Sequence, residues 1–324
     1  MNDLIPPFDF SRVFVEPWTI GRTGFISISL MGFFVALACG WVGQFLILRR
    51  MALVGDAISH SILPGLAGAF LLSGTRSATA MFIGALVAGL ATSAIIEVIH
   101  RKTRVKQDAA IGIAFTSLFA LGVLLINLYA GKVDLDQECV LYGEIAFIAF
   151  EPPAMLGGWN LGPQPIVQMG IVTIITGVIL LLFYKELLVS SFDSGLAFSL
   201  GIHPSVVHYA LMAWLSVVVV SAFESVGAIL VVAMLILPGA TASMLTTRLP
   251  VILALVVINA ALSSVLGYHF AMWLDCSVAG AMVVCGGILF AVAWLCSPHD
   301  GLPAYFHRRT LEVDVSADGE AGQS

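Results

Sequence analysis

The residues best suited to chemistry are Asp56 and His60, which lie four positions apart in the segment GDAISH. In a helix, residues at positions i and i+4 share one face, so the carboxylate and the imidazole would meet. Such a pair can form half of a site for a divalent transition metal. Ionisable groups are costly at membrane depth and usually line an interior path. The alternative interpretation is a structural Asp–His ion pair that joins two helices.

The elements that hold this pair are predicted to be membrane helices. Of the 324 residues, 59% are hydrophobic and 10% are charged, whereas soluble domains carry about 25% charged residues. The apolar segments reach the length of about 20 residues that a helix needs to cross a bilayer. They lack the alternating pattern of barrel strands. The chain is therefore predicted to be an all-α, polytopic integral membrane protein. The sequence contains no basic patch with interleaved aromatic residues of the kind that would indicate binding to nucleic acid.

Nine apolar segments are candidate membrane crossings, and basic residues set their orientation. The segments cover residues 24–48, 53–73, 78–99, 108–130, 166–184, 206–223, 226–245, 250–270 and 277–296. Basic residues follow the first, third, fifth, seventh and last segments, which places those ends in the cytoplasm and the N-terminus outside. The weakest boundary lies within 206–245, because a re-entrant segment there would reduce the count to eight.

The chain is predicted to have three parts. Residues 1–23 form an external N-terminal segment, 24–297 form the transmembrane domain, and 298–324 form an acidic, disordered cytoplasmic tail. Within the domain, residues 186–205 are too polar to span a membrane. They are predicted to form one or two short helices at the cytoplasmic surface.

Two Pro-Gly pairs lie inside apolar segments, Pro64-Gly65 and Pro238-Gly239. Proline lacks a backbone N–H and clashes with the carbonyl four residues earlier, which for Pro64 is that of His60. A helix break is therefore predicted at each pair, and broken helices in corresponding places often mark a transport path. A simple helix end is the alternative at Pro238.

Other polar residues are weaker candidates. Glu224 lies between two apolar runs, and it is either a third oxygen ligand for Mn²⁺ or Zn²⁺ or a solvated loop glutamate. The acidic run Asp134, Asp136 and Glu138 is interpreted as a solvated loop in preference to a cation guide. His203 and His208 are interpreted as surface residues. His269 and Asp275 are a weak candidate for an entry funnel.

Enzyme signatures are absent from the sequence. The Gly131-Lys132 pair is followed by valine and lacks the earlier glycine of an ATP-binding loop, and no HExxH or GxSxG pattern occurs. The chain is therefore not predicted to be an enzyme, and ATP hydrolysis would need a separate subunit.

The segment LRRMALVGDAISHSILPG at residues 48–65 resembles the signature of the metal-type ABC importer permeases, the zinc, manganese and iron group. Three further segments fit this family in the same order. They are QDAAIG at 107–112, the loop around Phe192 and Asp193, and GAILV at 227–231 leading to LPGATA at 237–242. The resemblance spans roughly residues 20–297.

The resemblance implies a permease subunit of an ATP-driven importer in the bacterial plasma (inner) membrane, surrounded by lipid. Its implied partners are cytoplasmic ATPase subunits, an extracytoplasmic metal-binding protein and a second permease, either a copy or a relative. The metal path would be lined by Asp56 and His60, with Glu224 as a third contributor. The implied coupling loop contains Phe192, Asp193, Gly195, Ala197 and Gly201.

The same resemblance implies a metal ion as cargo, with no cofactor bound permanently. The acidic residues between Asp134 and Glu144 are similar to those of manganese-type members, which favours manganese over zinc or iron. The rival interpretation is a stand-alone carrier that couples a divalent cation to protons through Asp56 and His60.

Overall fold

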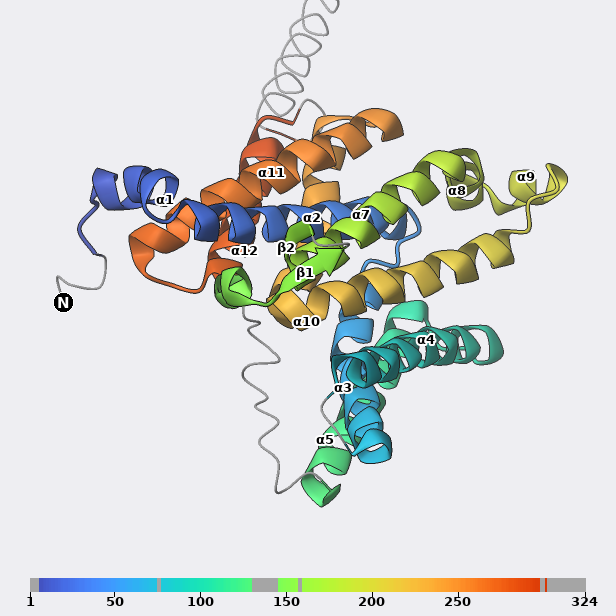
Figure 1. The fold of residues 1–324 in the computed structure, drawn as a ribbon. Helices are drawn as coiled ribbons and strands as arrows, with labels where there is room; N and C mark the ends of the chain where they lie inside the picture. Colours follow the sequence, from blue (N-terminus) through green and yellow to red (C-terminus); the bar gives the residue numbers. More distant parts are fainter. Residues whose placement is uncertain (1–5, 75–76, 130–144, 157–158, 298–300, 302–324) are drawn as a thin grey trace, which may run out of the picture.

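The computed structural model describes residues 6–74, 77–129, 145–156, 159–297 and 301. Within this part the chain is almost entirely helical (Figure 1), which confirms the predicted all-α class. The exception is a small antiparallel hairpin of β1 (Pro153–Leu156) and β2 (Trp159–Pro163). The acidic residues Asp134, Asp136 and Glu138 and the tail from 302 onward lie outside the described residues, so those predictions stay untested.

Eight long helices and several short ones make up the described part of the chain. The long helices are α2 (Arg22–Leu48), α3 (Leu53–Ser73), α4 (Ala78–Lys102), α5 (Gln107–Tyr129), α7 (Gln164–Leu182), α10 (Pro204–Leu245), α11 (Leu249–Leu274) and α12 (Val278–Leu295). The short ones are η1 (Ser11–Val15), α1 (Glu16–Thr19), η2 (Ile145–Phe150), α8 (Tyr184–Phe192) and α9 (Ser194–Ser199).

Eight described helices are long and apolar enough to cross a membrane. The predicted sixth and seventh crossings differ from the fold: helix α10 covers both 206–223 and 226–245, with one non-helical residue at Gly227. The part after this break, Leu230–Leu245, is a shorter apolar helix. At 1.5 Å per residue it spans only about 24 Å, less than the hydrocarbon core of about 30 Å.

Helix α2 lies at the centre of the main body, between α10, α11 and α7 (Figure 1). Its side chains Met31, Val35 and Phe45 are fully buried. Glycines let its neighbours approach closely, because a Cβ at Gly40 would lie 3.0 Å from Pro238 Cβ in α10. Small residues at helix contacts are the usual means of close packing between membrane helices.

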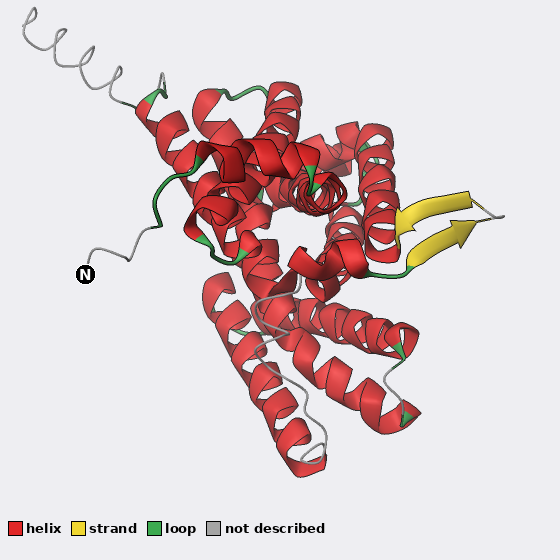
Figure 2. Cartoon of the chain, turned by 60° about the vertical axis from the view of Figure 1, so that its left-hand side comes forward, coloured by secondary structure: helices red, strands yellow, loops and turns green. Residues whose placement is uncertain are grey.

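Helices α3, α4 and α5 form a group that projects from this main body (Figures 1 and 2). The group packs on itself and joins the main body mainly through contacts of α3 and α4 with α10. Helix α3 therefore connects the two parts, and it is the helix that carries Asp56 and His60.

The N-terminal segment packs on the end of α11. The His269 side chain is buried, and its Nδ1 lies 2.8 Å from the carbonyl oxygen of Val13. Its ring stacks on Phe14 with centroids 4.9 Å apart. Asp275 is exposed and lies 3.5 Å from the Arg12 guanidinium. These contacts make the two residues anchors for the N-terminal segment, and they argue against the entry funnel.

Candidate functional site

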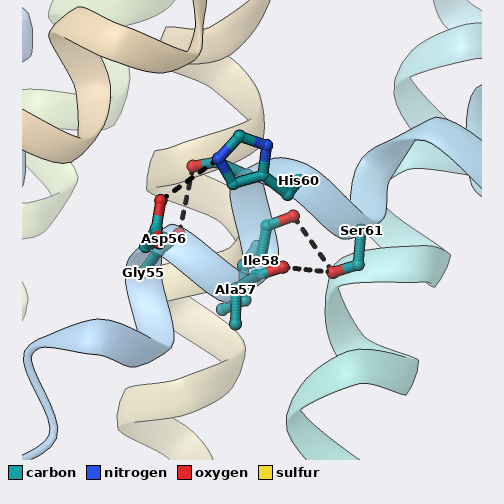
Figure 3. Close-up of polar contacts among 7 residues, drawn as sticks. Gly55, Asp56, Ala57, Ile58, His60 and Ser61 are labelled. Atoms are coloured by element: carbon teal, nitrogen blue, oxygen red, sulfur yellow. Dashed lines mark hydrogen bonds and ion pairs between the residues drawn. The ribbon is translucent and has the colours of Figure 1, made fainter. Parts of the chain in front are cut away.

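Asp56 and His60 meet on one face of α3, as their spacing predicts. The His60 Nε2 atom lies 3.3 Å from Asp56 Oδ1 (Figure 3). The two side chains are 31% and 37% exposed, so a path can reach both. Asp56 lies in the first turn of α3, where the positive end of the helix dipole favours a carboxylate.

The measured separation suits two neighbouring ligands on one metal ion. Ligand distances of about 2.1 Å are typical for imidazole nitrogen and carboxylate oxygen on zinc. With both at that distance, two atoms 3.3 Å apart subtend an angle of about 100° at the ion. This angle falls between the octahedral and tetrahedral values that divalent transition metals adopt. The separation of the two atoms therefore matches that of neighbouring ligands on one ion.

Aromatic rings and a polar contact with α4 hold this part of α3 in place. The His60 ring packs near Phe115 and Phe119 of α5, at centroid distances of 5.6 and 6.2 Å. Ser61 points to another side of the helix (Figure 3), where its hydroxyl accepts a hydrogen bond of 2.7 Å from Thr92 of α4. The hydrogen bond of Ser61 fixes that side of α3 to α4. The side of α3 that carries Asp56 and His60 stays open.

The pair lies near one end of its helix. Asp56 and His60 occupy the first two turns of α3, beside the basic turn that contains Arg49 and Arg50. The predicted segment 53–73 has the same bounds as α3, and the neighbouring side chains Val54 and Ala57 are almost fully buried.

The Pro-Gly pairs are packing points and not helix ends. Helix α3 runs through Pro64 and α10 runs through Pro238, so neither pair ends its helix, and the predicted breaks as kinks at Pro64-Gly65 and Pro238-Gly239 stay predictions. A Cβ at Gly122 of α5 would lie 2.7 Å from the Pro64 nitrogen. A Cβ at Gly239 would lie 2.7 Å from the Gln44 side-chain oxygen of α2. Helix α5 therefore packs closely against the Pro64-Gly65 pair, and α2 packs closely against the Pro238-Gly239 pair.

The third predicted ligand, Glu224, lies in α10 three residues before Gly227. Its side chain is outside the described part of the structure, so its role stays a prediction. No group of three or more His, Cys, Asp or Glu side chains able to hold a metal occurs among the described residues. The Asp56–His60 pair alone therefore stays a predicted half-site.

The predicted coupling loop forms two short helices, α8 and α9. The Asp193 carboxylate caps α9 by accepting hydrogen bonds from the backbone N–H groups of Gly195 (2.8 Å) and Leu196 (3.0 Å). Gly201 has a φ of 80°, which ends the segment in a conformation that favours glycine. Ala197 is buried, so α9 is attached to the body through it.

Large apolar side chains stand exposed on this segment. Phe192 is 67% exposed and Phe198 is 69% exposed. Exposed aromatic residues on a short, capped helix pair offer a contact surface for another protein.

Sequence reasoning misjudged one histidine and missed one arginine. His208 was predicted at the surface, but its Nε2 lies 3.1 Å from Glu97 Oε2, and both side chains are largely buried. The Arg101 side chain also pairs with Glu97. Arg49 binds two serines of α8. Arg101 and Glu97 are four residues apart in α4, whereas the His208–Glu97 and Arg49–serine contacts join elements far apart in sequence, where no spacing pattern points to them.

Comparison with known proteins gives a consistent result. A family model described as "ABC 3 transport family" matches residues 25–297. The chain is similar to the manganese transport system membrane protein MntD of Bacillus subtilis, with 45% identity over 271 residues, which cover 84% of this chain and 91% of that protein. It is also similar to the zinc transport system membrane protein TroD of Treponema pallidum, with 42% identity over 86% of this chain and 75% of that protein.

The fold is similar to a solved chain of PsaBC from Streptococcus pneumoniae in complex with Fab. The TM-score is 0.72 with 32% sequence identity, over 90% of this chain and 98% of that chain.

Proposed function

The chain belongs to the ABC 3 transport family, and we propose that it is the permease subunit of an importer that moves Mn²⁺ into the cytoplasm. It is a multi-pass protein of the bacterial plasma membrane, with eight described helices long enough to span it. It is a permease and not itself an enzyme. Family membership favours ATP-driven import over a stand-alone proton-coupled carrier.

The observation that carries the proposal is the Asp56–His60 pair. Two ligand atoms 3.3 Å apart on an open helix face can hold one divalent cation, but a complete site needs at least two more ligands. A second permease copy, presenting its own pair, would supply them. Glu224 remains our candidate for a further carboxylate ligand.

The ion is proposed from the ligands and from the names of the relatives. One carboxylate oxygen and one imidazole nitrogen suit manganese, zinc and iron alike. The relative with 45% identity is named for manganese transport and one with 42% identity for zinc transport. Manganese is therefore our first choice of cargo and zinc the second.

Partner proteins follow from the same proposal. An ABC permease implies ATPase subunits and a substrate-binding protein. We assign the ATPase contact to α8 and α9, because Phe192 and Phe198 stand exposed there. The binding protein would deliver the ion at the opposite side. ATP binding would then move α8 and α9 and open the path around Asp56 and His60.

The test is metal uptake by bacteria that express the chain with its ATPase and binding protein. Asp56→Asn and His60→Ala should each reduce accumulation of labelled manganese to the background of cells without the permease, at equal membrane levels. Ser59→Ala is the matched control, because among the described residues the Ser59 hydroxyl bonds only the Gly55 carbonyl of its own helix. Uptake unchanged in both site variants, or insensitive to ATP depletion, would contradict the proposal.

A further inference from the structure

The side chain of Arg49 joins the end of α2 to the short helix α8. Its Nη2 lies 2.8 Å from Ser190 Oγ and its Nε lies 3.0 Å from Ser191 Oγ. A guanidinium can only donate hydrogen bonds, so both hydroxyls accept. Each hydroxyl in turn donates to the carbonyl of Leu187, at 3.3 and 2.6 Å. The direction of every bond in this contact is therefore fixed.

This contact is the polar link between α8–α9 and the helices beside them. In the described part of the chain, no other side-chain hydrogen bond or ion pair joins α8 or α9 to another long helix. Hydrogen bonds from a charged donor are stronger than neutral ones. Arg49 therefore gives α8 a charge-assisted connection to the end of α2.

The turn after Arg49 connects α2 rigidly to α3. Arg50 has a φ of 58°. The backbone N–H of Arg50 bonds the Ile47 carbonyl at 3.0 Å, and that of Met51 bonds the Leu46 carbonyl at 2.8 Å. These two bonds are the pattern of a Schellman helix end. The Val54 N–H then bonds the Met51 carbonyl at 3.1 Å, so α3 begins within the same turn.

The distance along the chain from this turn to the site is short. Asp56 follows Arg49 by seven residues and lies in the first turn of α3. The turn is held by backbone bonds at both ends, so it links the residue that carries the guanidinium to the first turn of α3.

We propose that Arg49 is a positioning residue that transmits movement of α8 and α9 to the start of α3, and so to the Asp56–His60 pair. The inference rests on the proposed function, in which α8 and α9 meet the ATPase. The inference adds Arg49 as the residue that connects α8 and α9 to the Asp56–His60 pair.

The first test measures transport and hydrolysis together in proteoliposomes that hold the complex with its ATPase and binding protein. Arg49→Ala should lower the manganese transported per ATP hydrolysed about tenfold, because two charge-assisted hydrogen bonds are lost. Ser190→Ala combined with Ser191→Ala should do the same, and all three changes together should do no more. Arg50→Ala is the matched control: it removes the same charge one residue later, from an exposed side chain.

An unchanged ratio in Arg49→Ala would overturn the proposal, as would effects of the arginine and serine changes that simply add. A merely structural role would lower the amount of complex and leave the ratio intact. Wild-type complex that moves no manganese with ATP would refute the proposed function instead.

The second test is independent of metal transport. Spin labels are placed at Leu53→Cys and Lys185→Cys, both exposed positions, after the five native cysteines are replaced by alanine. In the complex with its ATPase, the label distance should stay narrow and unchanged when a non-hydrolysable ATP analogue binds. With Arg49→Ala the distribution should broaden or shift between the two states. An identical distribution with and without Arg49 would refute the transmission role.

Discussion

Gly65 of α3 and Gly84 of α4 lie backbone against backbone. A Cβ at either position would overlap the carbonyl oxygen of the other, and a Cβ at Gly65 would also lie 2.6 Å from Ala88 Cβ. Ala69 and Ala88 follow the two glycines four residues later, so each helix presents a small residue one turn on. The contact fixes α4 against the helix that carries the candidate site, one turn beyond His60.

Gly65→Ala should therefore destabilise the protein. The added methyl group meets backbone atoms that cannot rotate away, and overpacking of this kind costs about 1–3 kcal/mol. Alanine's higher helix propensity offsets about 1 kcal/mol of this at most. The measurement is thermal unfolding of the purified protein in detergent, with a lower midpoint expected.

The control for this change is Gly68→Ala, on the same helix one turn later. Nothing lies within 4 Å of a Cβ at Gly68, so this variant should unfold at the wild-type temperature or above it. Equal midpoints for the two variants would show that the glycine contact does not hold α3 and α4 together.

Gly227 should not tolerate a side chain. Its φ of 75° and ψ of 166° lie in a region that essentially only glycine adopts, and other residues there cost about 1–3 kcal/mol. Gly227→Ala is expected to lower the unfolding midpoint and reduce transport, since α10 contacts both α2 and α3. Gly287→Ala in α12 serves as comparison, because nothing lies within 4 Å of its Cβ. A Gly227→Ala protein as stable and active as the comparison variant would refute the strained break in α10.

Capping of α9 by Asp193 gives a further prediction. Asp193→Ala removes two hydrogen bonds to the first turn of α9, and loss of such a cap costs about 1 kcal/mol. Faster hydrogen exchange in 194–199 and weaker retention of the ATPase during purification are expected. Asp193→Asn keeps an oxygen acceptor and should behave as wild type. Faster exchange in the asparagine variant to the same degree would show that the cap is not the cause.

Transport should decline as the medium becomes more acidic. His60 must be neutral to offer a lone pair to the ion, and a protonated His60 would pair with Asp56 instead. Asp56 is the charged group that faces the His60 ring among the described residues, and the rings of Phe115 and Phe119 line the other sides. Manganese uptake per ATP hydrolysed should therefore fall between about pH 7.5 and about pH 5.5. A flat ratio over this range would exclude His60 as a ligand.

The sequence predicts the local features of this protein well and the long-range ones poorly. The spacing of Asp56 and His60 is sufficient to place them on one helix face, since the helical period is fixed. Apolar length identifies the long helices, and Gly201 marks the end of the coupling segment. Within α10 the chain is helical through Pro238, and its non-helical residue, Gly227, lies beside the predicted boundary between the segments 206–223 and 226–245.

Contacts between distant segments account for the rest. The Arg49–Ser190 bond joins residues 141 positions apart, and the Glu97–His208 pair joins residues 111 apart. Neither contact has a local signal in the sequence. An arginine that follows an apolar segment indicates the orientation of that segment, and a single histidine is interpreted as a surface residue. The match of Gly65 with Gly84 also becomes visible only once α3 and α4 are placed side by side.

Direct observation of the ion's ligands tests the central claim most sharply. The purified complex is loaded with Mn²⁺ and the electron spin echo is examined for modulation by a directly bound imidazole nitrogen. The account predicts nitrogen modulation in the wild-type protein and in Ser59→Ala. It predicts loss of that modulation in His60→Ala and loss of bound Mn²⁺ in Asp56→Asn. Bound Mn²⁺ without nitrogen modulation in the wild type, or with modulation that persists in His60→Ala, would contradict the claim that Asp56 and His60 hold the transported metal.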